Sequence, residues 1–252
     1  MKLFAMTDVG CKRSSNQDAF CQAHLPSDGE FMVLCDGMGG HRGGNVASAI
    51  AVRAFRGLLF SRFSGSEKIR PKDLKILLEW IITGVSRLIA QTAAESSEYS
   101  GMGSTVVLAL RRGKKMCIAH VGDSRAYLYR NGSLRRLTRD HSLVQDLIDR
   151  GEISPEEGVN HPHRNVITRT LGYAEDSTPE IQICDVRQGD LFLLCSDGLT
   201  VTVPDNELEQ LLQTIPPQDL APQLIARARE GGGPDNVTVG ILYEEESEEN
   251  QR

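Results

Sequence analysis

Four aspartates, Asp36, Asp123, Asp197 and Asp235, share one kind of position in the sequence. Each lies beside a short apolar run, at the point where that run begins or ends. Short apolar runs bounded by Asp and Gly predict buried strands, and the ends of neighbouring strands meet along shared sheet edges. Asp18, near the start of the chain, adds a fifth candidate. We therefore expect these carboxylates to converge although they are far apart in the chain.

Packed carboxylates repel one another and raise one another's pKa unless cations neutralise them. Ligand sets made only of oxygen suit hard ions such as Mg²⁺ and Mn²⁺, whereas Zn²⁺ usually recruits Cys or His. No regular His or Cys spacing surrounds these aspartates. The alternative is that they are ordinary turn residues, since Asp and Gly are common in turns. That alternative fits any single Asp-Gly pair better than the whole set, so the sequence favours a hard-metal cluster.

The apolar runs that carry the aspartates predict strands joined by short turns. Asn131-Gly132 is a strong hairpin signal between two of them. Consecutive strands with tight connections favour antiparallel sheets. The predicted strands cover residues 31–35, 105–110, 116–121, 126–130, 191–195 and 237–243.

Apolar residues recur at intervals of three and four over two long segments, which predicts amphipathic helices. Strands and helix pairs arrive in blocks, without strict alternation, so the pattern favours an α+β fold in one domain spanning residues 1–243. The first two helices are expected to cover one sheet as a pair. The predicted helices cover residues 45–59, 73–94, 142–150, 205–212 and 218–230.

The composition argues against several classes of partner and compartment. The 252 residues carry a net charge of −6 and no long basic run, so neither nucleic acid nor an anionic membrane is an expected partner. The start of the chain has no signal-peptide pattern, and no apolar stretch looks long enough to span a bilayer. The six cysteines form no CxxC pair and are expected to be reduced thiols in the cytoplasm. The acidic tail at residues 244–252 is expected to be solvated and mobile.

Six short segments, each weak alone, carry a family resemblance through their order and spacing. They are RSSNQD (13–18), VLCDGMGGH (33–41), GMGST (101–105), VGDSR (121–125), CSDGLT (195–200) and GPDNVT (233–238). Together they resemble the metal-dependent protein serine/threonine phosphatases of the protein phosphatase 2C (PP2C or PPM) type, in their bacterial form. The match runs from near residue 7 to residue 243, which is nearly the whole chain.

The resemblance implies an αββα sandwich, in which two mostly antiparallel sheets are flanked by helix pairs and the metal site lies at one edge. It also implies two core Mn²⁺ or Mg²⁺ ions. Asp36 would bridge them, and the Gly37 carbonyl would complete one of them. Asp197 and Asp235 would hold the first ion, and Asp18 would reach the second through water.

The resemblance further implies a weaker third-metal site formed by Asp123 with Asp197, and a phosphate-binding role for Arg13. A planar guanidinium takes two phosphate oxygens at once, although Arg13 read alone is also compatible with an ordinary surface arginine. A water activated by two metals would hydrolyse phosphoserine and phosphothreonine monoesters. The implied partners are phosphorylated proteins, including a bacterial Ser/Thr kinase and its targets, and a monomer is expected. The alternative is a catalytically silent binding or sensor module with the same fold.

The general acid is the open part of this interpretation. Met38 stands where many eukaryotic members have His, and methionine cannot donate a proton. His41 lies nearby in the sequence and remains a candidate, with packing as the alternative. Residues 140–172 resemble the variable flap of the family, beside the cleft. Within it His161 is a candidate for substrate binding, and a solvated loop is the alternative.

Overall fold

Alternating side chains along the strands divide the protein into layers. In β3 (Glu30–Met38), Phe31 and Val33 face a helix pair, whereas Met32 and Leu34 face the other sheet. Because β3 is buried on both faces, its apolar residues form a continuous run and successive side chains point to opposite layers. Apolar layers therefore lie between the two sheets and beneath each helix pair. The computed structural model describes residues 1–26, 29–64, 70–173 and 177–245.

The described strands pair in antiparallel fashion in two sheets. The first sheet has the order β1-β11-β10-β7-β8, and the second has the order β2-β3-β5-β6-β9, with the short β4 paired to β3. The first sheet comprises β1 (Lys2–Asp8), β7 (Arg125–Arg130), β8 (Ser133–Arg136), β10 (Leu191–Cys195) and β11 (Val237–Tyr243). The second comprises β3 with β2 (Asp18–His24), β4 (Gly103–Ser104), β5 (Val106–Arg112), β6 (Lys115–Val121) and β9 (Glu180–Asp185).

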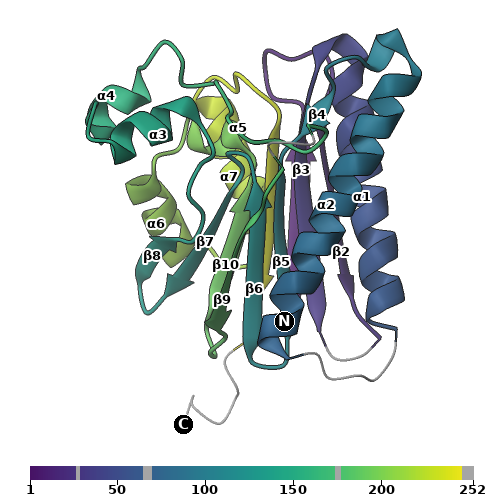
Figure 1. Cartoon of the computed structure of the whole chain (residues 1–252). Coiled ribbons are helices and arrows are strands. Elements are labelled where there is room, and N and C mark those ends of the chain that lie inside the picture. The colour runs from purple at the N-terminus through teal and green to yellow at the C-terminus, as the bar shows by residue number, and fades with distance from the viewer. Residues whose placement is uncertain (27–28, 65–69, 174–176, 246–252) are drawn as a thin grey trace, which may run out of the picture.

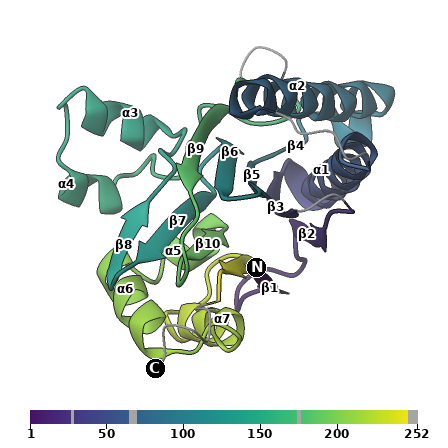
Figure 2. The ribbon, with the colours of Figure 1, turned by 90° about the horizontal axis from the view of Figure 1, so that it is seen from below.

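Two helix pairs cover the outer faces of the sheets (Figures 1 and 2). α1 (Gly40–Arg62) and α2 (Pro71–Glu95) pack on the second sheet. α6 (Asp205–Thr214) and α7 (Leu220–Glu230) pack on the first. This layering confirms the αββα sandwich expected from the sequence. Both long helices begin earlier than their apolar spacing predicts, because polar and glycine residues fill their first turns.

α2 meets the length and composition criteria of a membrane-spanning helix, with a mean hydropathy of 1.2 over its most apolar window. This differs from the sequence analysis, which expects no apolar stretch long enough to span a bilayer. The high value arises because apolar side chains also occur on its outer side, where Ile76 and Trp80 are 66% and 65% exposed. The inner side is part of the protein core, where Leu78 and Ile82 are buried. Core packing therefore accounts for the apolar character of this side of α2.

A segment outside the sandwich carries α3 (Leu143–Asp149) and α4 (Pro155–Val159), on the same side of the molecule as the short α5 (Asp197–Thr200) (Figure 1). Ser142 caps α3 by accepting a hydrogen bond from the Gln145 N–H at 3.2 Å. Ser154 and Glu157 form a reciprocal capping box at α4. A short 3-10 helix, Ser97–Tyr99, links α2 to β4.

The strands that the sequence does not predict lie mainly at sheet edges. β1, β2, β8 and β9 are edge strands, and nearly all of their residues are half-buried or exposed, with no run of buried residues. An edge strand covers less of the core, so it carries a weaker hydrophobic signal. Residues 246–252 of the predicted mobile tail lie outside the described residues, and Glu245 just before them pairs with Lys2 at 2.5 Å.

Candidate metal centre

Asp18 and Asp36 are brought together by the register of two neighbouring strands. They are direct partners in the antiparallel pairing of β2 with β3. The backbone of Asp36 is fixed on its other side by Thr105, whose Oγ1 accepts from the Asp36 N–H at 3.0 Å and whose N–H donates to the Asp36 carbonyl at 2.8 Å. Ser104 Oγ donates to the same carbonyl at 3.0 Å. The Asp36 side chain is therefore presented from a rigid backbone.

Asp197 and Asp235 are supplied by the other sheet. Asp197 begins α5 directly after β10, and Asp235 lies just before β11, which pairs with β10. The two turns are packed closely, since a Cβ built on Gly198 would lie 2.0 Å from the carbonyl oxygen of Asn236. Asp123 follows β6 through Gly122. Both sheets thus contribute carboxylates to one edge of the sandwich.

Burial and mutual repulsion raise the pKa values of these carboxylates. Burial raises the pKa of Asp36 well above its usual range, and the charges of Asp18, Asp197, Asp123 and Asp235 raise it further. Burial also raises the pKa of Asp197, with Asp123 and Asp235 adding to the effect. The pKa values of Asp18 and Asp123 both rise to about 6, chiefly because burial disfavours the charged forms. Without cations, ionising this cluster is unfavourable.

Three buried oxygens in the cluster have no hydrogen-bond partner among the described residues. They are the Oδ1 atoms of Asp18, Asp123 and Asp197. Buried polar atoms normally have a hydrogen-bond partner, so a group of unpartnered carboxylate oxygens indicates a site for cations. The aspartate cluster offers oxygen donors, which fit Mn²⁺ or Mg²⁺. The residues present therefore fit a hard divalent ion, as the sequence analysis predicts.

Two hydroxyl groups that the sequence analysis misses orient Asp18. Ser196 Oγ and Thr238 Oγ1 donate to Asp18 Oδ2 at 2.7 and 2.6 Å. These bonds use one carboxylate oxygen and leave Oδ1 facing the cluster without a partner. Ser196 precedes Asp197 and is fully buried, and Thr238 lies within the apolar β11. A hydroxyl residue next to a candidate ligand, or inside a predicted buried strand, is the sequence feature that could have identified these two residues.

Gly37 lies where the chain can accommodate no side chain. A Cβ at this position would lie 2.1 Å from the Gly44 carbonyl oxygen, so only glycine allows β3 to approach the start of α1 this closely. The Gly37 N–H donates to the Gln17 carbonyl at 3.1 Å.

Arg13 reaches the cluster from the loop between β1 and β2. Its Nη2 donates to Asp235 Oδ2 at 2.7 Å, and its side chain remains 53% exposed. The bond to Asp235 raises the pKa of the guanidinium, so Arg13 stays charged. The group therefore combines contact with the aspartate cluster and access from solvent, which a phosphate-binding residue requires.

His161 lies away from these contacts, on the segment that carries α3 and α4. Its Nδ1 accepts from the His163 N–H at 3.2 Å, and the two rings lie 5.7 Å apart. Among the described residues, no hydrogen bond links it to the aspartates. Met38 ends β3 and offers no proton. The side chain of His41 is outside the described part of the chain.

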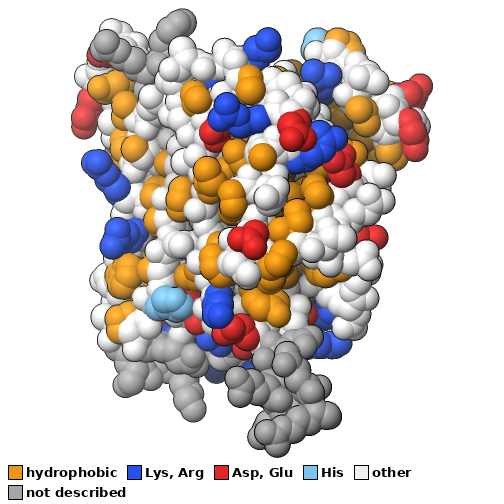
Figure 3. Space-filling view, turned by 180° about the vertical axis from the view of Figure 1, so that it is seen from behind, with side chains coloured by type: hydrophobic (Ala, Val, Ile, Leu, Met, Phe, Trp, Pro, Cys, Tyr) orange, Lys and Arg blue, Asp and Glu red, His pale blue; other side chains and the backbone are white. Residues whose placement is uncertain are grey.

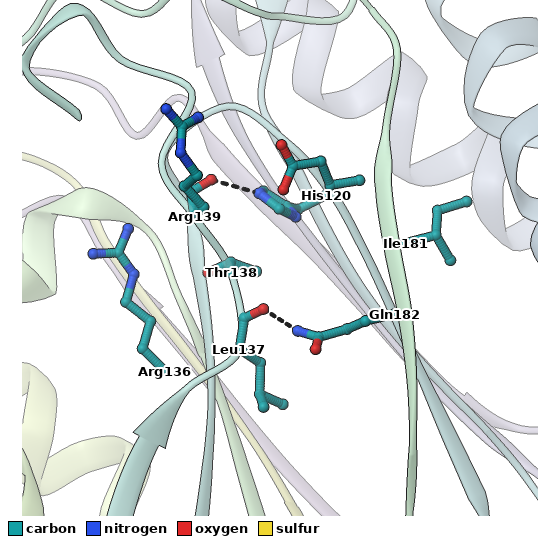
Figure 4. Close-up of a pocket in the computed structure, with 8 residues that line it drawn as sticks. His120, Arg136, Leu137, Thr138, Arg139, Ile181 and Gln182 are labelled. Atoms are coloured by element: carbon teal, nitrogen blue, oxygen red, sulfur yellow. Dashed lines mark hydrogen bonds between the residues drawn. The ribbon is translucent and has the colours of Figure 1, made fainter. Parts of the chain in front are cut away.

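A second group of possible ligands, His120, His141 and Glu180, lies beside a hollow of about 350 Å³. Figure 4 shows His120 donating from Nε2 to the Arg139 carbonyl, at 2.7 Å. The Gly122 N–H donates to His141 Nδ1 at 3.2 Å, so the neutral ring carries its proton on Nε2. That atom lies 3.2 Å from Glu180 Oε1.

The charge of this second group is already balanced. Burial lowers the pKa of His141 to about 4, which keeps the ring neutral. Arg169 Nη1 lies 3.5 Å from the Glu180 carboxylate and 3.4 Å from His141 Nε2. A metal at this place would have to displace both a ring proton and a guanidinium. Hydrogen bonding therefore accounts for the group without an ion.

Comparison with known proteins places these features in a family. The family model described as protein phosphatase 2C matches residues 11–228. The Listeria monocytogenes serine/threonine phosphatase stp is 37% identical over 238 residues, which cover 94% of this chain and 93% of that protein.

Solved structures agree with the sequence match. The Streptococcus agalactiae serine/threonine phosphatase superposes with a TM-score of 0.88 at 33% identity, covering 97% of this chain and 99% of that one. The catalytic domain of the phosphatase PstP, solved in complex with two manganese ions, superposes with a TM-score of 0.82 at 34% identity, covering 95% and 96%. On its sequence, its fold and its cluster of strand-end carboxylates, the chain belongs to the protein phosphatase 2C family.

Proposed function

We propose that this protein is a metal-dependent protein serine/threonine phosphatase that hydrolyses phosphoserine and phosphothreonine monoesters. The observation that carries the proposal is the group of buried, unpartnered carboxylate oxygens beside an exposed arginine. Membership of the family and the names of its relatives as serine/threonine phosphatases support the same activity. The manganese ions in the PstP complex support Mn²⁺ or Mg²⁺ as the cofactor.

In this proposal Asp36 would be a ligand common to two core ions, Asp197 and Asp235 would hold one of them, and Asp18 would support the other through water. The Gly37 carbonyl would add a neutral ligand. Bound divalent ions supply a water of lowered pKa and offset the charge of the phosphoryl group. The chain's own part is to hold these ligands in place, since each carboxylate is presented from the end of a strand or helix.

Asp123 with Asp197 forms a third, weaker site in this proposal. Asp123 Oδ1 is buried and unpartnered among the described residues, and burial together with the charge of Asp123 raises the pKa of Asp197. Asp123 lies at the end of β6, apart from the pair formed by Asp18 and Asp36. A site with fewer close ligands binds its ion less tightly.

Arg13 binds the substrate phosphoryl group in this proposal. It would exchange its bond to Asp235 for the phosphoryl oxygens, because Asp235 would then share its negative charge with a bound ion. A guanidinium binds two oxygens of one phosphate in a fixed geometry, which orients the ester for attack by water. His161, on the segment beside the cleft, is retained as a candidate for contact with the peptide.

We further propose that the substrates are phosphorylated proteins, among them a Ser/Thr kinase and its targets, and that the protein acts as a monomer in the cytoplasm. All six cysteines are free, which fits a reducing compartment. The net charge of −6 does not attract phosphorylated partners in general, so recognition depends on local groups such as Arg13.

The test is release of phosphate from p-nitrophenyl phosphate and from a phosphothreonine peptide, with Mn²⁺, with Mg²⁺ and with a chelator. We expect activity only with metal. Asp36→Asn should abolish it, whereas Asp185→Asn, the same change at an exposed carboxylate paired with Lys115, should leave it unchanged. A folded wild type that binds metal but is silent on both substrates would instead support a binding module.

A further inference from the structure

Hydrogen bonds and close backbone contacts at its base hold the loop that carries Arg13. It spans residues 9–17 between β1 and β2, and residues 11–14 at its tip are exposed. On one side it borders a hollow of about 550 Å³ between β1 and α7, lined by Met6, Cys11 and Ile225 among others. Figure 3 shows the protein from behind, where apolar side chains lie between charged ones. Few apolar contacts therefore fix where Arg13 lies.

One buried side chain reaches three points of this loop. Asn236 Nδ2 donates to the carbonyl oxygens of Val9 at 2.9 Å and Ser15 at 3.0 Å. Its Oδ1 accepts from the Gln17 N–H at 2.8 Å. The side chain is buried, with 4% of the residue exposed. Both Nδ2 hydrogens are thus used on carbonyls that lie on opposite sides of Arg13 in the sequence.

Asn236 also belongs to the metal-binding turn. It follows Asp235 directly, and its own N–H donates to Asp235 Oδ1 at 2.8 Å. Its carbonyl lies against Gly198, next to Asp197. The residue therefore connects the turn that carries one candidate metal ligand to both ends of the segment that carries the phosphate-binding arginine.

We propose that Asn236 is a positioning residue that sets the place of the Arg13 guanidinium relative to the metal centre. This inference rests on the proposed function, in which Arg13 binds the phosphoryl group. The Cys11 N–H bond to the Gly233 carbonyl at 2.8 Å holds one point of the loop. Asn16 joins the two sides within the loop itself, since its Nδ2 donates to Thr7 Oγ1 at 2.8 Å and its Oδ1 accepts from the Asp18 N–H at 3.1 Å. Asn236 differs because its bonds join both sides of the segment to the turn that carries Asp235.

The test is a double-mutant cycle on a phosphothreonine peptide with saturating Mn²⁺. Losing a charge-assisted bond to phosphate in Arg13→Ala should raise KM about tenfold or more. Asn236→Ala should raise KM by about fivefold, with a smaller change in kcat, because the loop no longer presents the guanidinium correctly. In the Arg13→Ala background, Asn236→Ala should change KM by less than about twofold. Independent, additive effects on KM would overturn the proposal.

A second variant separates the role in the loop from general stability. Asn236→Asp retains an oxygen for the Gln17 N–H but loses both donations to Val9 and Ser15, so it should show the same loss that depends on Arg13. Calorimetry with Mn²⁺ should still find two tightly bound ions in Asn236→Ala, and loss of either ion would assign the residue to the metal site instead. Leu212→Ala, which opens the core beneath α6, should lower stability without raising KM.

Hydrogen exchange distinguishes failure of this inference from failure of the proposed function. In the metal-free protein, the amide of Gln17 should exchange at least about tenfold faster in Asn236→Ala than in the wild type, while amides of β5 should be unaffected. Unchanged exchange at Gln17 would overturn the positioning role even if the enzyme is active. Faster exchange in a protein without phosphatase activity would leave the loop contact standing and refute the proposed function alone.

Discussion

Raising the pH should destabilise the metal-free protein, and Asp18 is the residue at which this can be measured most directly. Its pKa rises from an ordinary value of 3.8 to about 6, mainly because burial disfavours the carboxylate. The folded state therefore binds a proton more tightly than the unfolded state does. Stability from this group is fully present below the unfolded pKa and is lost as the pH rises through the folded pKa.

The size of the effect follows from the two pKa values. At about pH 5 the folded Asp18 is mostly protonated and the unfolded one is mostly ionised, whereas at about pH 7.5 both are ionised. The free energy of unfolding should fall by about 1.4 kcal/mol over this interval through Asp18 alone. Asp123 has a similarly raised pKa and should lower the free energy of unfolding over the same pH interval. The total fall in the wild type should therefore be larger than the part due to Asp18.

The assay is urea unfolding followed by circular dichroism in the presence of a chelator, at about pH 5 and about pH 7.5. Asp18→Asn keeps an oxygen for the Ser196 and Thr238 hydroxyls but cannot titrate. Between the two pH values its free energy of unfolding should therefore fall by about 1.4 kcal/mol less than that of the wild type. Asp185→Asn is the matched control, because the pKa of Asp185 is lowered by its bond to Lys115 and the group stays ionised throughout.

Two results would refute this reasoning: an equal pH dependence in Asp18→Asn and the wild type, or a metal-free wild type that becomes more stable as the pH rises. Excess Mn²⁺ should reverse the trend, because cations replace the protons in the cluster and bind better when the carboxylates are ionised. At about a hundredfold excess over Kd, one bound ion should add about 2.7 kcal/mol at about pH 7.5.

Further predictions concern the third site, the phosphate contact and a backbone approach. Asp123→Ala should weaken turnover while calorimetry still detects two tightly bound Mn²⁺ ions, and loss of all metal would contradict the assignment. Arg13→Lys should raise KM for a phosphopeptide without changing the number of bound ions, because an ammonium cannot form the two parallel bonds; an unchanged KM would argue against this contact. Gly37→Ala should lower the free energy of unfolding by about 2 kcal/mol or more, since its Cβ would meet the Gly44 carbonyl. Gly84→Ala, in α2 with no atom within 4 Å of the added Cβ, should raise it by roughly 0.5–1 kcal/mol, and urea unfolding of both variants tests the contrast.

Some contacts at the centre had only weak signals in the sequence. Ser196 and Thr238 orient Asp18 from positions 178 and 220 residues away. Asn236 reads as an ordinary turn residue until its bonds to the distant loop are seen. Such partners are set by the way the two sheets pack on each other, which local propensity does not encode.

The central strands and the kind of site could be predicted from the amino-acid sequence. Continuous apolar runs identify the buried strands because both of their faces must be covered, and aspartates at the ends of those runs already indicate a hard-metal site. The edge strands β1, β2, β8 and β9 carry weaker patterns and became visible only in the sheets. The tertiary structure alone decided that Asp18 lies opposite Asp36, and that Arg13 reaches Asp235. These are contacts between distant segments, set by strand register and loop closure, and no local spacing in the chain specifies them.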